Sequence, residues 1–347
     1  MRIFSYRNKR AAKHLLLFLG IAALVFLMFF VIRFIYLQRF LVYSNGTIQL
    51  NYNQQLEKQP EAAPPVWDDT EIEIILAEPE VQINEAYEEP MKTLTGFYIT
   101  TKMLSNIDAV HAALAEQETA PKTIMLDLKS IYGNFYYSSG TSGATMATAA
   151  DIGQVDLLIE ELAERPGTYL IARIASLSDY NFALANQSCG LPMRSGALWM
   201  DSDGCFWLDP MSETVQAYLA SIAQELAQMG FDEVVFDDFR IPDSTSIVYN
   251  NELSREEAAA EAAASLRENL AAEPIRISFN SENPNVAASS DRVYLVTEDG
   301  SSVSSLVESV QETLEDPSAQ IVFLTASRDT RFEGYGILRP LIEERTE

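Results

Sequence analysis

From residue 94 onward, apolar and polar positions follow the pattern of short β-strands separated by helical stretches. Near-continuous apolar runs occupy residues 96–100, 123–128, 169–175, 233–238, 276–280, 293–297, 320–325 and 334–338. Strands of this kind that alternate with helices form parallel sheets covered on both faces. No glycine-rich phosphate loop follows any run, which disfavours a nucleotide-binding sheet. The pattern predicts a (β/α)8 TIM-type barrel, with an open doubly wound sheet as the alternative.

Start and stop signals mark several helices between these runs. Ser105-x-x-Asp108 and Ser254-x-x-Glu257 match the capping box, in which two side chains satisfy free backbone N–H groups at a helix start. Gly230 is expected to end another helix. The apolar face of that helix consists of Val215, Leu219, Ile222 and Leu226. The segment 281–292 is too short for a full helix, so we expect the second half of the barrel to be trimmed.

The N-terminal region contains a candidate membrane span. Residues 15–32 carry no charge, and apolar character resumes after Arg33 as far as Tyr43. About 20 apolar residues cross a hydrocarbon core of ~30 Å. A cleaved signal peptide would end in small residues, whereas bulky aromatic residues follow here; a buried core helix is the other alternative. We predict a transmembrane helix over residues 15–43.

Charge divides the chain into an N-terminal basic part and an acidic body. The protein has 24 basic and 50 acidic residues in 347, yet residues 1–40 hold seven cations and no acid. More cations precede the span than follow it, so residues 1–14 are expected to be a cytoplasmic tail and the rest extracytoplasmic at the plasma membrane. An acidic body disfavours nucleic acid as a partner. Residues 44–93, acidic and proline-containing, predict an extended stalk before a barrel over 94–347.

Charged residues gather at the ends of the predicted strands, where TIM barrels carry their reactive groups. They are Asp127, Lys129, Arg173, Asp237, Asp238, Arg240, Glu282, Glu298 and Asp299. Paired carboxylates are what glycoside hydrolysis requires, one as acid and the other as nucleophile or base. Consecutive side chains of a strand point to opposite faces, so at most one of Asp237 and Asp238 faces the barrel axis. The alternative is that these acids form salt bridges that anchor loops.

Other kinds of chemistry have little support in the sequence. The two histidines are His14, beside the predicted span, and His111, in a predicted helix. No G-x-S-x-G motif occurs, so a serine triad is not expected. Two cysteines and two histidines in these places do not make a zinc site. Asp201-x-Asp203-Gly204 is interpreted as a turn, with a calcium site as the alternative. We expect neither a cofactor nor a metal.

The long loop after the third strand contains both cysteines and several aromatic residues. Outside the membrane, Cys189 and Cys205 are expected to form a disulfide, with two free buried thiols as the alternative. Near a barrel mouth, Tyr180, Trp199 and Trp207 either stack against sugar rings of a substrate or pack the loop.

From about residue 94 to the end, the chain resembles a bacterial family described as the putative glycosyl hydrolase domain, TIM-barrel relatives of α-amylase-like enzymes. The matching strings are GFYIT, TIMLDLKSIYGNFYY, YLIARIASLSD, LWMD with GCFWLDP, and MGFDEVVFDDFRIP. The resemblance implies a barrel that faces carbohydrate, with Asp237 in the place of the relatives' nucleophile. It also implies an acid at the end of the fifth strand, where Glu282 is the candidate.

Three hypotheses follow from these observations. The first is a membrane-anchored glycoside hydrolase-like protein that acts on cell-wall or environmental polysaccharide through Asp237 and Glu282, supported by the other charged strand ends. The second is a catalytically inactive barrel that binds glycan or an envelope protein partner. The third, a structural protein of an envelope complex, gives no role to the charged strand ends.

Overall fold

The computed structural model describes residues 41–44, 47–50, 94–117, 122–249 and 252–343. The first two of these segments form an antiparallel hairpin, β1 (Leu41–Ser44) and β2 (Thr47–Leu50), where we expected the end of the span and the start of the stalk. The remainder of the predicted span, residues 15–40, and most of the stalk lie outside the described residues. Among those that are described, no helix has the length and apolar character needed to cross a bilayer.

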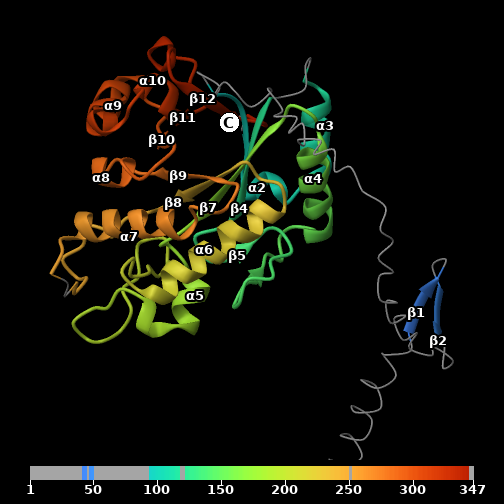
Figure 1. The fold of residues 1–347 in the computed structure, drawn as a ribbon, viewed down its shortest axis with the longest axis horizontal. Coiled ribbons are helices and arrows are strands. Elements are labelled where there is room, and N and C mark those ends of the chain that lie inside the picture. Colours follow the sequence, from blue (N-terminus) through green and yellow to red (C-terminus); the bar gives the residue numbers. More distant parts are fainter. Residues whose placement is uncertain (1–40, 45–46, 51–93, 118–121, 250–251, 344–347) are drawn as a thin grey trace, which may run out of the picture. The chain divides into compact units, whose positions relative to one another are not determined.

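Residues 94–343 fold into a closed barrel of eight parallel strands (Figure 1). The barrel strands are β3 (Thr95–Ile99), β4 (Thr123–Lys129), β7 (Tyr169–Ala175), β8 (Glu233–Asp237), β9 (Arg276–Asn280), β10 (Val293–Val296), β11 (Ile321–Leu324) and β12 (Gly336–Pro340). Each strand pairs with its neighbours in chain order, and β3 pairs with both β12 and β4 to close the ring. The predicted TIM-type barrel and its eight strands are therefore confirmed.

The close approach of two strands at the closure requires a glycine. A Cβ atom added to Gly96 of β3 would lie 2.1 Å from the carbonyl oxygen of Thr123 in β4. No side chain fits there without moving the backbone of one strand. Beyond β4 the sheet is extended by two short strands, β5 (Asn134–Phe135), antiparallel to β4, and β6 (Thr145–Met146).

Helices cover the outside of the barrel unevenly (Figure 1). In the first half they are α2 (Thr101–Leu104), α3 (Ile107–Ala115), α4 (Ile152–Glu164), α5 (Tyr180–Ala185), η2 (Gln187–Cys189), α6 (Glu213–Gln228) and α7 (Arg255–Asn269). In the second half they are α8 (Pro284–Ala287), η3 (Gly300–Ser302), α9 (Val303–Val310), η4 (Gln311–Thr313), α10 (Pro317–Gln320) and η5 (Thr330–Phe332). The short α8 and η5 confirm that the second half is trimmed.

The helix signals were partly right. Ser254 caps α7 in a complete capping box with Glu257, and the predicted apolar face of α6 is buried before Gly230, whose φ is +89°. However, α3 begins one residue later than expected. Its cap is Asn106, whose side chain accepts a hydrogen bond from the N–H of Ala109, so the Ser105 pattern did not mark the start.

Alternation along the strands divides their side chains between the interior of the barrel and the helices. Ile124 and Leu126 of β4 belong to the large core shared with the helices, whereas Met125 belongs to a separate cluster inside the ring. The other buried members of the interior cluster are Leu94, Ile171, Val235, Tyr294, Val322, Leu324 and Leu338. Successive side chains on the same face of a strand are two residues apart. The side chains that follow this interior cluster toward the carboxyl ends of the strands therefore lie at the mouth of the barrel.

A buried charged network fills the interior at the opposite end from the mouth, which we call the floor. Glu233 of β8 and Arg292, just before β10, form an ion pair with side-chain exposures of 0% and 5%. The Glu233 carboxylate also accepts hydrogen bonds from the hydroxyls of Tyr169, Ser278 and Tyr294 at 2.8, 2.6 and 2.9 Å. Each charge therefore has a partner, as burial demands.

Candidate active site

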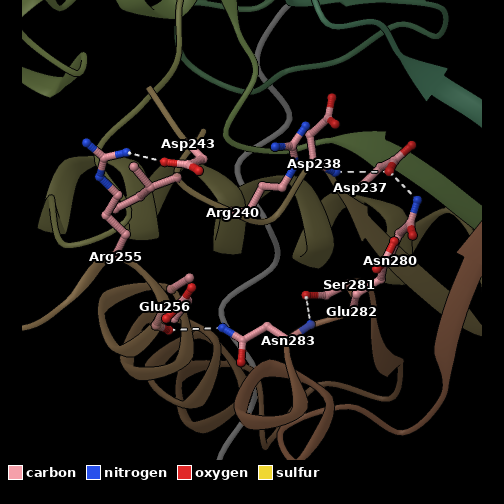
Figure 2. A pocket seen from close by; sticks show the side chains of 12 residues that line it. Asp237, Asp238, Arg240, Asp243, Arg255, Glu256, Asn280, Ser281, Glu282 and Asn283 are labelled. Atoms are coloured by element: carbon pink, nitrogen blue, oxygen red, sulfur yellow. Dashed lines mark hydrogen bonds and ion pairs between the residues drawn. The ribbon is translucent and has the colours of Figure 1, made fainter. Parts of the chain in front are cut away.

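Asp237 is the last residue of β8 and lies at the mouth of the barrel, on the same face as Glu233 and Val235. Its Oδ1 accepts hydrogen bonds from Asn280 Nδ2 at 2.6 Å and from the N–H of Asp238 at 2.9 Å, as Figure 2 shows. Oδ2 lies 3.7 Å from Nε of Arg173. The carboxylate is thus held by donors on three sides and stays one-quarter exposed.

Arg173 links Asp237 to a second carboxylate. Nε and Nη2 of Arg173 donate to the two oxygens of Asp127 at 2.7 and 2.6 Å, a bidentate pair across β4 and β7. Burial raises the pKa of Asp127, although the charge of Arg173 acts in the opposite direction. Burial alone would lower the pKa of Arg173, but the two carboxylates raise it. Arg173 therefore stays charged between them.

Asp238 turns away from Asp237 in a backbone conformation that is rare for residues other than glycine. Its φ is +52°, a value that Asp and Asn adopt more readily than other residues. Oδ2 of Asp238 accepts a hydrogen bond from Ser178 Oγ at 2.6 Å. Burial raises the pKa of Asp238, and the adjacent charge of Asp237 raises it further. Only Asp237 of this pair joins the contacts with Asn280 and Arg173.

Lys129, at the end of β4, forms a fully buried ion pair that sequence reasoning did not identify. Its Nζ lies 2.8 Å from Oδ2 of Asp179, and both side chains have 0% exposure. The same ammonium donates to the carbonyl of Ala175 at 2.5 Å. Ala175 pairs with Asp237 in the sheet, and the N–H of the next residue donates to the Asp237 carbonyl. Lys129 therefore helps to fix the strand end that carries Asp237.

A cavity of about 530 Å³ opens beside Asp237. It lies over the ends of β8 and β9 and the N-terminus of α7, and its polar lining is shown in Figure 2. Glu282, two residues after β9, lines this cavity together with Asp237. The side chain of Glu282 is exposed and makes no hydrogen bond or ion pair with other residues that the structure describes. The cavity thus brings together Asp237 and Glu282 from neighbouring strand ends, and its lining also includes the acids Asp238, Asp243 and Glu256.

Residues 96–309 match the family described as the putative glycosyl hydrolase domain, which is more than half of the 347 residues. The chain belongs to this family. The match confirms the resemblance drawn from the sequence and makes residues 94–343 a glycoside hydrolase-like domain.

Two solved structures that are similar to this glycoside hydrolase-like domain are distant from it in sequence. A hypothetical protein from Ruminiclostridium thermocellum is 23% identical with a TM-score of 0.46, over 53% of this chain and 96% of its own. The glycoside hydrolase domain of PgaB from Bordetella bronchiseptica is 13% identical with a TM-score of 0.49, over 71% and 93%. No curated protein matches the chain. At these identities the likeness extends to the fold and to nothing finer.

Three of the predicted supporting residues of the domain lie outside the Asp237 network. Arg240 is exposed, and its guanidinium lies 5.1 Å from the centre of the Trp207 ring. Glu298 accepts hydrogen bonds from the N–H groups of Ala326 and Ser327 and so anchors the loop after β11. Asp299 caps η3 by accepting from the backbone and side chain of Ser301. Glu298 and Asp299 hold loops, the alternative given for strand-end acids.

The predicted disulfide is wrong, because both cysteines are free and buried. Sγ of Cys205 lies 2.8 Å from the carbonyl oxygen of Ile131, whereas Sγ of Cys189 accepts from Ser212 Oγ at 3.5 Å. The two thiols thus contact different elements of the loop region. Burial raises the pKa of Cys205 to about 12, so this thiol is unreactive at neutral pH.

The three aromatic residues proposed as a stacking platform pack against neighbouring residues in this structure. Trp207 is 4% exposed and donates to Asp201 Oδ2 at 2.7 Å, Tyr180 stacks on Phe206 with ring centres 5.0 Å apart, and Trp199 packs partly against the core. None of the three lines the cavities beside Asp237. They pack the loop, the alternative that the sequence left open.

The Asp201–Gly204 segment is a turn, as interpreted. Oδ1 of Asp201 accepts from the N–H groups of Asp203 and Cys205 at 3.0 and 2.9 Å. In the part of the chain that the structure describes, no group of three His, Cys, Asp or Glu side chains is placed to hold a metal ion.

Sequence reasoning missed Asn280, which contacts Asp237 directly. Asn280 ends β9, so the rule that selected the charged strand ends would have found it if neutral amides had been included. Asp179 could not be found in the same way. It lies in a loop, as the N-cap of α5, and its pairing with Lys129 is a long-range contact.

Proposed function

We propose that the barrel hydrolyses glycosidic bonds of a cell-wall or environmental polysaccharide, with Asp237 as nucleophile or base and Glu282 as acid. One observation carries the proposal: Asp237 stands at the carboxyl end of its strand, held by Asn280 and Arg173, in a cavity that Glu282 also lines. This is the end at which TIM-barrel enzymes carry their reactive groups. Membership of a glycosyl hydrolase family supports the same chemistry.

In the reaction, Glu282 gives a proton to the glycosidic oxygen as the bond from that oxygen to the anomeric carbon breaks. Asp237 then has two possible roles. It attacks the anomeric carbon, and water later hydrolyses the covalent intermediate while Glu282 takes back a proton, so that configuration is retained. Alternatively, it removes a proton from the water that attacks directly, and configuration is inverted. The anomer first released, observed by NMR, distinguishes the two routes.

Replacement of either carboxylate tests the proposal. We expect Asp237→Asn and Glu282→Gln each to lower hydrolysis by about 10²–10⁴-fold, because each removes a group that acts on the bond being cleaved. Reducing-sugar release from a panel of wall and plant polysaccharides measures the effect on the full chain in detergent. Asp108→Asn, on the outer helix α3, is the matched control and should keep full activity. Wild-type rates in Asp237→Asn would reject the assignment.

An inactive barrel that binds glycan or an envelope protein partner is the second candidate. The exposed Glu282 favours it, since no described residue fixes that side chain opposite Asp237. A glycan array and a hydrolysis screen separate the two candidates. Wild-type protein that binds glycans and cleaves none of them supports the second.

We also propose that the chain is a single-pass plasma-membrane protein whose barrel lies outside the cytoplasm. The apolar segment 15–32 and the cations around it support this topology. Protease added to intact cells should digest the barrel and leave the N-terminal tail protected. A barrel that is protected in intact cells and digested after lysis would reject this topology.

A further inference from the structure

A second, smaller hollow adjoins Asp237. Its volume is about 340 Å³, and both hollows fall within the roughly 300–1,000 Å³ of pockets that bind small molecules. The lining of the smaller one includes Tyr132, Asn134, Tyr136, Arg173 and Asp237. Among the described residues, Asp237 is the only one that lines both hollows.

The order of strands places the two hollows on opposite sides of Asp237. Around the ring, β4 is followed by β7, β8 and β9. The smaller hollow lies over β4 and β7, with the segment that leads into β5. The larger lies over β8, β9 and the start of α7. Asp237, at the end of β8, therefore stands at the boundary between two binding spaces.

The smaller hollow presents aromatic rings to the solvent. Tyr132 is 42% exposed, yet its hydroxyl donates to the carbonyl of Asp203 at 2.9 Å. An exposed ring whose hydroxyl is held by a hydrogen bond offers a flat surface of fixed orientation. Tyr136 lines the same hollow and is half-buried. Oδ1 of Asn134 accepts a hydrogen bond from Nδ2 of Asn181 at 3.1 Å. The amide N–H groups of Asn134 therefore point away from Asn181.

Charge in the smaller hollow is balanced by pairing. Asp127 is paired with Arg173, and Lys129 with the buried Asp179. A ligand here consequently meets aromatic faces and hydrogen-bonding groups, and the shared Asp237 is itself paired with Arg173 at 3.7 Å. These are the features that suit an uncharged sugar ring.

We propose that the smaller hollow is a second sugar-binding subsite, so that a neutral polysaccharide lies across Asp237 with sugar units on both sides and is cut within the chain. This inference rests on the proposed function, because it takes the bond that is cleaved to lie at Asp237. It adds the binding groups, Tyr132, Tyr136 and Asn134, and the mode of cleavage.

Binding can be measured without cleavage by using the full chain with Asp237→Asn. The probes are dimers and hexamers of β-1,4-linked glucose, mannose and N-acetylglucosamine and of α-1,4-linked glucose, titrated by calorimetry. We expect at least one hexamer to bind about tenfold or more tighter than its dimer, because units on both sides of Asp237 contribute. Tyr132→Ala with Tyr136→Ala should weaken binding of that hexamer at least tenfold.

Two control variants make the result specific. Tyr136→Phe keeps the ring and should keep the affinity, which separates stacking from loss of structure. Tyr180→Ala removes a tyrosine outside both hollows and should leave the affinity unchanged. Hexamer affinity that is unaffected in the double alanine variant overturns the inference, as does the failure of every hexamer to bind.

The two proposals fail in different ways. With the wild-type chain, release of internal fragments from a hexamer supports both, and loss of those fragments in the tyrosine variants strengthens the second. Hydrolysis that releases only single terminal sugars keeps the proposed function and overturns the inferred cleavage within the chain. Binding of a hexamer that depends on the tyrosines, without any hydrolysis by the wild type, keeps the subsite and rejects the hydrolase.

Discussion

Two carboxylates adjacent in sequence have different surroundings because the chain turns between them. Asp237 still belongs to β8 and faces the barrel mouth, whereas Asp238 has a φ of +52° and reaches Ser178. Alternation along a strand predicts that the two point to opposite faces. It does not predict the turn, which buries Asp238 beside a second negative charge.

The raised pKa of Asp238 makes a testable contribution to stability. A carboxyl whose pKa is raised on folding contributes most below its unfolded pKa, and this contribution is lost as pH rises through the folded value. Asp238→Asn cannot ionise, accepts the same φ and can still accept from Ser178. We therefore expect its stability relative to wild type to increase between pH 4.5 and 7.5, by about 1.4 kcal/mol for each tenfold change in the ionisation constant.

Urea denaturation at several pH values measures this difference. Ser246→Ala is the control, because Ser246 is exposed and carries no ionisable group, so its stability relative to wild type should not change with pH. A relative stability of Asp238→Asn that falls with rising pH would contradict the expected direction.

At the scale of elements, the capping-box pattern identified the start of α7 and missed the start of α3 by one residue. Ser254 and Glu257 exchange hydrogen bonds at 3.2 and 2.8 Å at the start of α7. Ser105 instead donates to the carbonyl of Thr101, behind it in α2, and Asn106 takes the capping position of α3. Asn is as good a cap as Ser, so the sequence offered two adjacent candidates.

The cap of α7 matters because the first turn of this helix lines the larger cavity. We expect Ser254→Ala to lower the free energy of unfolding by about 1 kcal/mol, since it removes the acceptor for an otherwise unpaired N–H group. The midpoint of urea denaturation should fall while its slope stays constant. Ser105→Ala, which fits the same sequence pattern without capping α3, should cost under about 0.5 kcal/mol. Equal losses in the two variants would show that the cap is not responsible.

The sequence predicted the strands better than it predicted the contacts between residues of the site. Runs such as 123–128 and 169–175 are apolar on both faces because one face meets helices and the other fills the barrel, and this pattern is local. The contacts of the site join distant residues: Asp127 with Arg173, Lys129 with Asp179, Asp237 with Asn280. Strand ends identified Asp237 as a mouth residue, but its partners depend on register around the ring.

The same limit explains the errors in the loop after β7. Cys189 and Cys205 are close in sequence, but the folded loop directs their thiols toward Ser212 and Ile131. Composition could not distinguish an exposed Trp207 from a buried one. The rings that line the smaller hollow beside Asp237 are the exposed Tyr132 and the half-buried Tyr136, which follow β4 and precede the loop.

At the scale of the whole molecule, the barrel has charge at both ends of its interior. The floor contains Glu233 and Arg292, which share Tyr169 as a hydrogen-bond partner, and the mouth contains Asp237 with Arg173. Apolar residues such as Val235 and Ile171 separate the two. The floor is closed to solvent and the mouth is open, so loss of a charge partner is costly at the floor, and the proposed chemistry belongs to the mouth.

Removal of one partner of the floor pair should be costly. Arg292→Met leaves Glu233 buried without its cation, and we expect a loss of about 3–5 kcal/mol of unfolding free energy. The double variant Glu233→Gln with Arg292→Met removes both charges and should recover part of that loss. Chemical denaturation measures both. Arg328→Met, which breaks an exposed pair with Glu343, should cost at most about 1 kcal/mol. A similar small loss in Arg292→Met would contradict the role assigned to the floor.

The pairing of β3 with β12 has a consequence for how the chain acquires its structure. β3 ends at Ile99, and its partner begins at Gly336. The ring cannot close until the ribosome has released Pro340, the last residue of β12, and until then one edge of β3 is unpaired. Contacts between such remote segments slow folding and leave hydrogen-bonding groups open to other chains. Synthesis of this domain therefore includes an interval in which the edge of β3 that later pairs with β12 is open to pairing with other chains.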